Sequence, residues 1–234
     1  MKQKLDIDFL GRIEYGRAWK LQKELVEART ADPALADKLL LLEHPPTYTL
    51  GRHGGEENLI YSEEERREKG IAIYHVDRGG DVTYHGPGQL VGYPILNLKR
   101  RYGKGIGRIR NYVGDIEAVL LDALGALDIE ARLYEGFRGV WVEENGVLNK
   151  IAAIGVYVNR MGISSHGFAL NVNPDLAYFE GIIPCGIHDH GVTSMSRVLG
   201  REISIEDVLP QIIQSFTAVF DYDRQLEGNL YVNY

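Results

Sequence analysis

The chain has 234 residues, of which 44% are hydrophobic and 25% are charged, a composition typical of a globular protein with a sizeable core. Its formal net charge of −7 argues against general nucleic-acid binding, because phosphate contacts need a basic surface. No stretch approaches the ~20 apolar residues of a membrane span, and the first residues lack the apolar core of a secretory signal. We therefore expect a cytoplasmic protein that binds neither nucleic acid nor membranes and folds as one domain over residues 1–234.

Four segments carry the signals of helices. In chain order they are residues 16–30, 62–70, 108–127 and 204–220. The apolar stripe expected for the first consists of Trp19, Leu21, Leu25 and Val26, and that of the third consists of Ile109, Val113, Ile116, Leu120 and Leu124. The last segment opens with a capping box from Ser204 to Asp207, and Pro210 within it predicts a kink or a delayed start.

Short runs rich in Val, Ile and Tyr and bounded by Gly, Pro and Asn predict β-strands between the helices. They cover residues 38–44, 47–53, 71–77, 82–98, 139–144, 150–159 and 164–173. Asn145-Gly146 predicts a hairpin turn between two of them, because both residues tolerate a positive φ. Hairpins without a regular βαβ rhythm predict an α+β fold with a mixed, largely antiparallel sheet and packed helices.

The segment from Lys99 to Arg110 departs from the acidic balance of the chain. It holds six basic residues and no acidic one. One interpretation is a solvated loop and helix start, and the other is a docking patch for an acidic partner.

A glycine-rich segment, "RGGDVTYHGPGQ", runs from Arg78 to Gln89. It is not a phosphate-binding P-loop, because it lacks the GK[ST] ending of that motif. A surface turn is the simple interpretation. Two glycines beside Arg78, followed by a tyrosine and a histidine, favour instead a pocket wall that lets backbone approach a ligand closely.

Two strand segments carry polar residues among small ones. Lys150 begins "KIAAIGV" and is either a solvated strand end or a partly desolvated cation that needs an anion nearby. His166 lies in "SSHGFALNVN", where a buried core histidine is a simpler interpretation than a catalytic one.

Cys185, in "IIPCGI", is the only cysteine of the chain, so it forms no internal disulfide. A lone cysteine is often a small buried hydrophobe. Pro184 and Gly186 favour instead a fixed loop that presents the thiol. Because a thiol attacks as the thiolate and has an ordinary pKa near 8.5, a reactive Cys185 needs a neighbouring cation, from Lys150 or a histidine.

Taken together, these segments resemble the lipoyl(octanoyl) transferase family, the octanoyl-[acyl-carrier-protein]:protein N-octanoyltransferases. The resemblance rests on "LLEHPPTYTLGRH", "RGGDVTYHGPGQLVGYPI", "KIAAIGV", "SSHGFALNVNPDL", "IIPCGI" and "GVTSM", and extends over about two thirds of the chain. It implies the catalytic fold of biotin and lipoate protein ligases, which agrees with the α+β expectation.

The resemblance also implies roles for individual residues. Cys185 matches the nucleophile that carries the acyl thioester, and Lys150 matches the lysine that lowers its pKa. The substrate-binding stretches that it implies are Arg78, Gly79, Gly80, Asp81, Val82, Thr83, Tyr84 and His85 (first stretch), Ala153, Ile154 and Gly155 (second stretch), and Gly167, Phe168 and Ala169 (third stretch). Among these, Val82, Ile154, Phe168 and Ala169 are the expected lining of an apolar acyl slot.

The implied reaction transfers an octanoyl group from octanoyl-acyl carrier protein to a lysine, without a metal or cofactor. The implied acceptors are lipoyl domains of 2-oxoacid dehydrogenases and the glycine cleavage H protein. Two other functions stay open at this point. One is an ATP-dependent lipoate or biotin protein ligase, which needs no cysteine, and the other is a non-catalytic module that binds acyl carriers.

Overall fold

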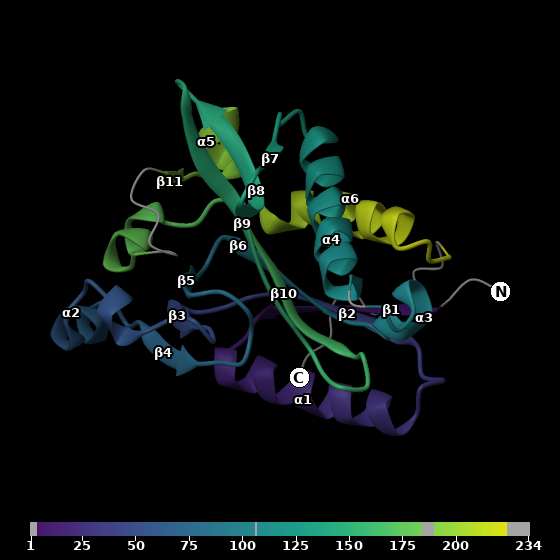
Figure 1. Cartoon of the computed structure of the whole chain (residues 1–234). Coiled ribbons are helices and arrows are strands. Elements are labelled where there is room, and N and C mark those ends of the chain that lie inside the picture. Colours follow the sequence, from purple (N-terminus) through teal and green to yellow (C-terminus); the bar gives the residue numbers. More distant parts are fainter. Residues whose placement is uncertain (1–3, 106, 184–189, 224–234) are drawn as a thin grey trace.

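The computed structural model describes residues 4–105, 107–183 and 190–223. A large sheet runs through the centre of the molecule (Figure 1). In spatial order its strands are β1 (Leu5–Arg12), β2 (Asp37–Glu43), β6 (Gln89–Ile95), β10 (Ser164–Asn171), β9 (Val147–Val158), β8 (Phe137–Glu144) and β7 (Arg132–Tyr134), and the short β11 (Gly191–Val192) pairs with β9. Only β1 with β2 and β11 with β9 are parallel pairs in this sheet. The predicted α+β class with a mixed, largely antiparallel sheet is confirmed.

Strand β2 is buried on both faces, which explains its unbroken run of leucines. Leu39 and Leu41 belong to the core beneath α4 (Arg108–Gly125) and α6 (Ile205–Val219). Leu40 and Leu42 point to the opposite face, where they pack with α1 (Tyr15–Ala31), because successive side chains of a strand alternate. Figure 1 shows α1 along one side of the sheet and α4 with α6 along the other.

A second, smaller sheet lies beside the large one and consists of β4 (Ala72–His75), β3 (Thr47–Leu50) and β5 (Val82–His85). Next to it in the sequence are the short helices η1 (Glu56–Asn58) and α2 (Glu63–Glu68), the latter capped by Ser62 as predicted. The predicted segment 82–98 contains two strands, because the turn at Gly86–Gly88 separates β5 from β6. This turn, which directly follows the first stretch, therefore connects the two sheets.

The predicted helices all form, with three differences from expectation. Ile109, predicted on the buried stripe of α4, is 47% exposed, because it lies in the first turn of the helix beside the cavity. The buried face of α1 includes Gln22 and Arg29, whereas Trp19 is only half-buried, so the predicted apolar stripe is wrong in part. Both polar side chains are buried because distant residues pair with them. Helix α6 begins directly after its capping box at Ser204, so Pro210 does not delay its start.

Several elements were not predicted from the sequence. They are β1, β7, β11, α3 (Leu98–Tyr102), α5 (Met195–Leu199) and η2 (Leu176–Gly181). They are short, or, like β1, pair in parallel with a strand that is distant in the sequence. No helix in the described part of the chain has the length and apolar character needed to cross a membrane.

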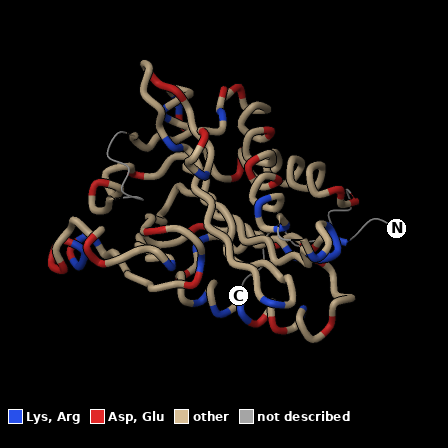
Figure 2. Tube along the Cα trace, in the orientation of Figure 1, with Lys and Arg blue, Asp and Glu red and all other residues tan. Residues whose placement is uncertain are grey.

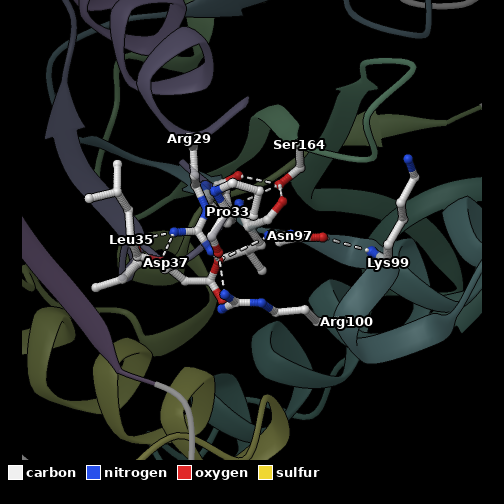
Figure 3. Close-up of polar contacts among 12 residues, drawn as sticks. Arg29, Pro33, Leu35, Asp37, Asn97, Lys99, Arg100 and Ser164 are labelled. Carbon is white, nitrogen blue, oxygen red and sulfur yellow. Dashed lines mark hydrogen bonds and ion pairs between the residues drawn. The ribbon is translucent and has the colours of Figure 1, made fainter. Parts of the chain in front are cut away.

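A buried ion pair joins the end of α1 to the start of β2 (Figure 3). Arg29 pairs with Asp37, and their side chains are 3% and 2% exposed. Asp37 also accepts hydrogen bonds from the Asn97 backbone at 2.9 Å and from the Tyr222 hydroxyl at 2.8 Å. Through Asp37, the pair therefore connects the start of β2 to Asn97, the residue that caps α3.

The hairpin between β8 and β9 forms as predicted. Asn145 and Gly146 have φ values of 53° and 79°, the left-handed conformation that a tight hairpin turn requires. The pairing that follows places Trp141 of β8 opposite Lys150 of β9. On its other edge, Lys150 is the register partner of Val192 in β11.

Candidate active site

A cavity of about 530 Å³ lies where β5, β9 and β10 approach one another, within the usual size range of small-molecule sites. All three predicted substrate-binding stretches reach it. The predicted residues on its wall are Arg78, Gly79, Gly80, Asp81, Val82, Thr83, His85, Lys150, Ala153, Ile154, Gly155, Gly167, Phe168 and Ala169. Tyr84 is not part of that wall, because its ring stacks on Tyr178 at 5.0 Å in the core of the small sheet.

Strand pairing brings the second and third stretches together. Phe168 lies opposite Ile154 and Ala169 opposite Ala153 in the antiparallel register of β10 and β9. The backbone N–H of Gly79 donates to the Val156 carbonyl at 3.0 Å, which ties the first stretch to β9. The three stretches therefore form one continuous wall.

Gly155 is required where the first stretch crosses β9. A Cβ atom at this position would lie 2.9 Å from Cδ of Arg78 and 3.0 Å from the carbonyl oxygen of Gly79. Such contacts are closer than real Cβ atoms tolerate, so a larger side chain would push the two walls apart.

Arg78 is buried, and its guanidinium anchors the first stretch to β3. Its Nη2 donates to the carbonyl oxygen of Thr49 at 2.7 Å and to the hydroxyl of Thr49 at 2.9 Å. Its Nη1 donates to the carbonyl oxygen of Gly79 at 3.1 Å. The predicted glycine-rich segment is thus held in place by its own arginine.

Lys150 lies on the cavity wall beside a group of aromatic rings. Its Nζ atom is 4.7 Å from the centre of the Trp141 ring. The ring of His190 lies 5.5 Å from that of Trp141 and 5.6 Å from that of Phe137, and all three residues contribute to the wall. The sequence analysis missed Phe137, Trp141 and His190, since only the β8–β9 register places Trp141 beside Lys150, and the other two rings gather around Trp141.

Cys185 lies outside the described residues, which omit 184–189. The described residue before this gap, Ile183, donates its backbone N–H to Asn58 at 2.9 Å. The residue after it, His190, is part of the cavity wall. The pairing of Cys185 with Lys150 stays a prediction.

Two buried histidines, His44 and His85, are poor sources of positive charge. Burial, together with neighbouring positive groups, holds the pKa of His85 well below its ordinary value. Its Nδ1 atom donates to Oε1 of Gln89 at 2.8 Å, which fixes the neutral tautomer. Burial likewise lowers the pKa of His44 to about 4. Lys150 is therefore a better candidate than His44 or His85 for the cation that the thiolate needs.

A series of hydrogen bonds connects His85 to the backbone of Lys150. Gln89, which accepts from His85, donates to Oδ1 of Asn171 at 2.9 Å. Asn171 donates to the carbonyl oxygen of Thr193 at 3.0 Å, and the Thr193 N–H donates to the carbonyl oxygen of Lys150 at 3.0 Å. The four bonds link the strands that carry the first stretch, the third stretch and Lys150.

Comparison with known proteins shows the family to which the chain belongs. The model of the lipoyl protein ligase A/B catalytic domain matches residues 14–217. A protein named octanoyltransferase from Rubrobacter xylanophilus is 48% identical over 210 residues, which cover 89% of this chain and 90% of that protein. One from Koribacter versatilis is 47% identical, covering 90% of this chain and 82% of that protein.

Solved structures share the fold at low sequence identity. The bi-partite lipoate protein ligase of Thermoplasma acidophilum aligns with a TM-score of 0.72 at 15% identity, covering 97% of this chain and 88% of that one. Lipoate-protein ligase A bound with ATP aligns with a TM-score of 0.70 at 15% identity, covering 98% of this chain and 90% of that one. The chain therefore belongs to the lipoyl protein ligase A/B catalytic-domain family and, within it, to the octanoyltransferase family that its motifs predicted.

Proposed function

We propose that this chain transfers an octanoyl group from octanoyl-acyl carrier protein to the ε-amine of a lysine on a lipoyl domain. The observation that carries the proposal is the cavity formed by the three predicted substrate-binding stretches, with Lys150 on its wall. Its apolar lining by Val82, Ile154 and Phe168 suits an eight-carbon chain. The acceptor domains are those of 2-oxoacid dehydrogenases and the glycine cleavage H protein.

In the first half-reaction the thiolate of Cys185 attacks the thioester carbonyl of the donor. A new carbon–sulfur bond forms to Cys185, and the bond to the carrier's phosphopantetheine sulfur breaks. The ammonium of Lys150 gives its proton to this leaving thiolate, so Lys150 becomes neutral. One thioester replaces another of similar energy, so the step needs no ATP.

In the second half-reaction the lysine amine of the acceptor attacks the octanoyl-enzyme. An amine with an ordinary pKa near 10.4 must lose a proton before or during this attack. That proton goes to solvent. As the neutral amine attacks, neutral Lys150 accepts the second proton, which the nitrogen loses as the amide forms, and the thiolate of Cys185 leaves. The ammonium and thiolate are thereby restored, and one octanoyl group has moved from sulfur to nitrogen.

The basic run from Lys99 to Arg110 supports docking of an acidic carrier, but not through all of its residues. Figure 2 shows basic residues of this run in blue about α3. Arg100 donates to the carbonyl oxygen of Pro33 (Figure 3), and Arg101 pairs with Asp115 at 2.9 Å. These two arginines therefore stabilise the fold. Lys104 and Arg110 are exposed, and Arg110 adjoins Ile109 of the cavity wall, so they are the better docking residues.

The experiment compares two acyl donors with the same lipoyl-domain acceptor. With octanoyl-acyl carrier protein and no ATP, mass spectrometry of the acceptor should show one octanoyl group on its target lysine. Free octanoate with ATP should give no product. Product formed only from octanoate and ATP would identify a ligase instead, and product from neither donor would leave only carrier binding.

A further inference from the structure

His166 has an unusual backbone conformation for its position in a strand. Its φ is 55°, in the left-handed region that residues other than glycine rarely adopt, although histidine enters it more readily than most. It lies in β10, opposite Val156 of β9, and its side chain is 2% exposed. Such a conformation persists only where the surroundings over-determine it.

Two polar contacts hold His166 in this conformation. Its backbone N–H donates to Oε1 of Gln22 in α1 at 2.8 Å. Its Nε2 atom lies 2.8 Å from Oδ1 of Asp77. Its Nδ1 atom is buried and has no hydrogen-bond partner among the described residues, so Asp77 is the only hydrogen-bond partner found there for the ring, which also contacts the rings of Trp19 and Tyr93.

The hydrogen bond between His166 and Asp77 joins two walls of the cavity. Asp77 immediately precedes Arg78, where the first stretch begins, and His166 immediately precedes Gly167, where the third begins. His166 itself contributes to the cavity wall. The bond lowers the pKa of the Asp77 carboxyl, which keeps that group charged and the contact strong.

A second contact also ties the first stretch to the large sheet. The first stretch touches β9 through the bond from Gly79 to Val156 at 3.0 Å, and Val156 is the register partner of His166. The beginning of the first stretch is thus tied to the large sheet at two neighbouring points, by the backbone at Gly79 and by a side chain at Asp77, while Arg78 ties it to β3 of the small sheet.

We propose that His166 is a positioning residue that, through Asp77, holds the first stretch against the third and so sets the acyl-chain length that the cavity prefers. The inference rests on the proposed octanoyl transfer. Loss of the bond would leave the first stretch tied to the large sheet mainly through Gly79, while Arg78 still ties it to β3. A wider cavity would then bind an eight-carbon chain less tightly and accept longer chains more readily.

The variants distinguish the loss of the His166–Asp77 hydrogen bond from a general loss of packing around it. His166→Asn keeps a residue that tolerates a positive φ, but its side chain is too short to replace the imidazole. Asp77→Ala removes the acceptor oxygen, whereas Asp77→Asn retains one oxygen that can accept from Nε2. The matched control is His75→Ala, because His75 also pairs with a carboxylate, Glu56 at 3.5 Å, but lies exposed and away from the cavity.

The measurement is steady-state transfer from hexanoyl, octanoyl, decanoyl and dodecanoyl carrier thioesters. His166→Asn and Asp77→Ala should each raise the octanoyl KM and reduce the octanoyl-over-decanoyl preference by about fivefold, with kcat nearly unchanged. The double variant should be no worse than either single one, because both remove the same bond. Asp77→Asn should regain most of the preference, and His75→Ala should match the wild type.

An unaltered chain-length preference in both single variants, or multiplied effects in the double variant, would overturn the inference while leaving octanoyl transfer standing. A wild-type protein that transfers no acyl group would overturn the proposed function, and this inference with it. Thermal unfolding of each variant identifies folding defects. If His166→Asn does not fold, the pair Asp77→Ala and Asp77→Asn decides the question, since the Asp77 side chain is 41% exposed.

Discussion

The Nζ atom of Lys150 lies 4.7 Å from the centre of the Trp141 ring, in a pair that the register of β8 and β9 sets face to face. An ammonium group is attracted to the negative face of an indole ring. Trp141 is buried, so the ring also fixes the direction of the lysine side chain on the cavity wall. This arrangement suits a lysine that must hold a positive charge beside a thiolate.

The first prediction concerns the reactivity of Cys185. Lys150→Ala should slow alkylation of Cys185 by iodoacetamide at pH 7 by about tenfold or more, because a thiol without a neighbouring cation is only about 3% ionised there. At pH 10 the two rates should converge, since the thiol is ionised in both proteins. Equal rates at pH 7 would remove Lys150 from its proposed role.

The second prediction concerns Gly155. Gly155→Ala should lower octanoyl transfer by about tenfold or more, because its Cβ would displace Arg78 and Gly79. The matched control is Gly114→Ala in α4, where a Cβ meets nothing within 4 Å. That variant should keep full activity and gain about 0.5–1 kcal/mol of stability. Full activity in Gly155→Ala would show that the walls do not need their present spacing.

The third prediction concerns the buried pair shown in Figure 3. Asp37→Asn should reduce the free energy of unfolding by about 3–5 kcal/mol, because it leaves the Arg29 guanidinium buried without its counter-charge. Glu24→Gln removes an exposed pair with Lys20 and should cost less than about 0.5 kcal/mol. Urea unfolding measures both, and similar losses would contradict the structural role of the buried pair.

The fourth prediction is acid sensitivity caused by His44. Its Nδ1 donates to the carbonyl oxygen of Ile13 and its Nε2 accepts from the Tyr93 hydroxyl, so the folded state holds the neutral ring. Burial lowers the pKa of His44 from 6.5 to about 4. Between these values the unfolded chain binds the proton and the folded chain does not, so stability present above pH 6.5 is lost as the pH falls towards 4.

The expected loss from His44 is about 3 kcal/mol across that range. Urea unfolding between pH 7 and pH 4.5 measures it. His44→Gln keeps one donor and one acceptor without titrating, so its stability should fall less steeply with pH. Some slope should remain, because burial also depresses the pKa of His85. Identical slopes in the two proteins would rule out His44 as a cause.

The fifth prediction concerns docking of the carrier. Reversing Lys104 and Arg110 to Glu should raise the KM for octanoyl-acyl carrier protein by about tenfold at low salt and weaken its salt dependence. The control reverses Lys20 and Arg67, which are exposed on α1 and α2 and change the net charge equally. A similar rise in KM in both double variants would indicate a net-charge effect instead of a docking patch.

Local signals predicted much of the fold, and long-range pairing set the rest. The capping box at Ser204 and the turn at Asn145-Gly146 depend on neighbouring residues, and both form as expected. Gln22 is buried because His166, 144 positions along the chain, supplies its partner, and Arg29 because Asp37, in the strand that follows the helix, supplies its counter-charge. No periodicity within α1 could reveal those partners, so the predicted apolar stripe was wrong in part.

In the candidate site, too, some residues are predicted by local sequence signals and others are brought together only by long-range pairing. The first stretch could be found from composition and motif, because glycine beside arginine is a local signal, whereas the family resemblance implied the second and third stretches. Trp141 and His190 could not be found in this way, because the pairing of β8 and β11 with β9 brings Trp141 beside Lys150 and His190 beside Trp141. The hydrogen bond from His166 to Asp77 likewise joins residues 89 positions apart.

The central claim is that the octanoyl group passes through a thioester on Cys185. Its most direct test is intact-mass spectrometry of the protein after incubation with octanoyl-acyl carrier protein and no acceptor. The wild type should gain the mass of one octanoyl group, sensitive to hydroxylamine, and Cys185→Ala should gain none. A wild-type protein that transfers octanoyl groups yet shows no adduct, or a Cys185→Ala variant with full transfer activity, would contradict the claim.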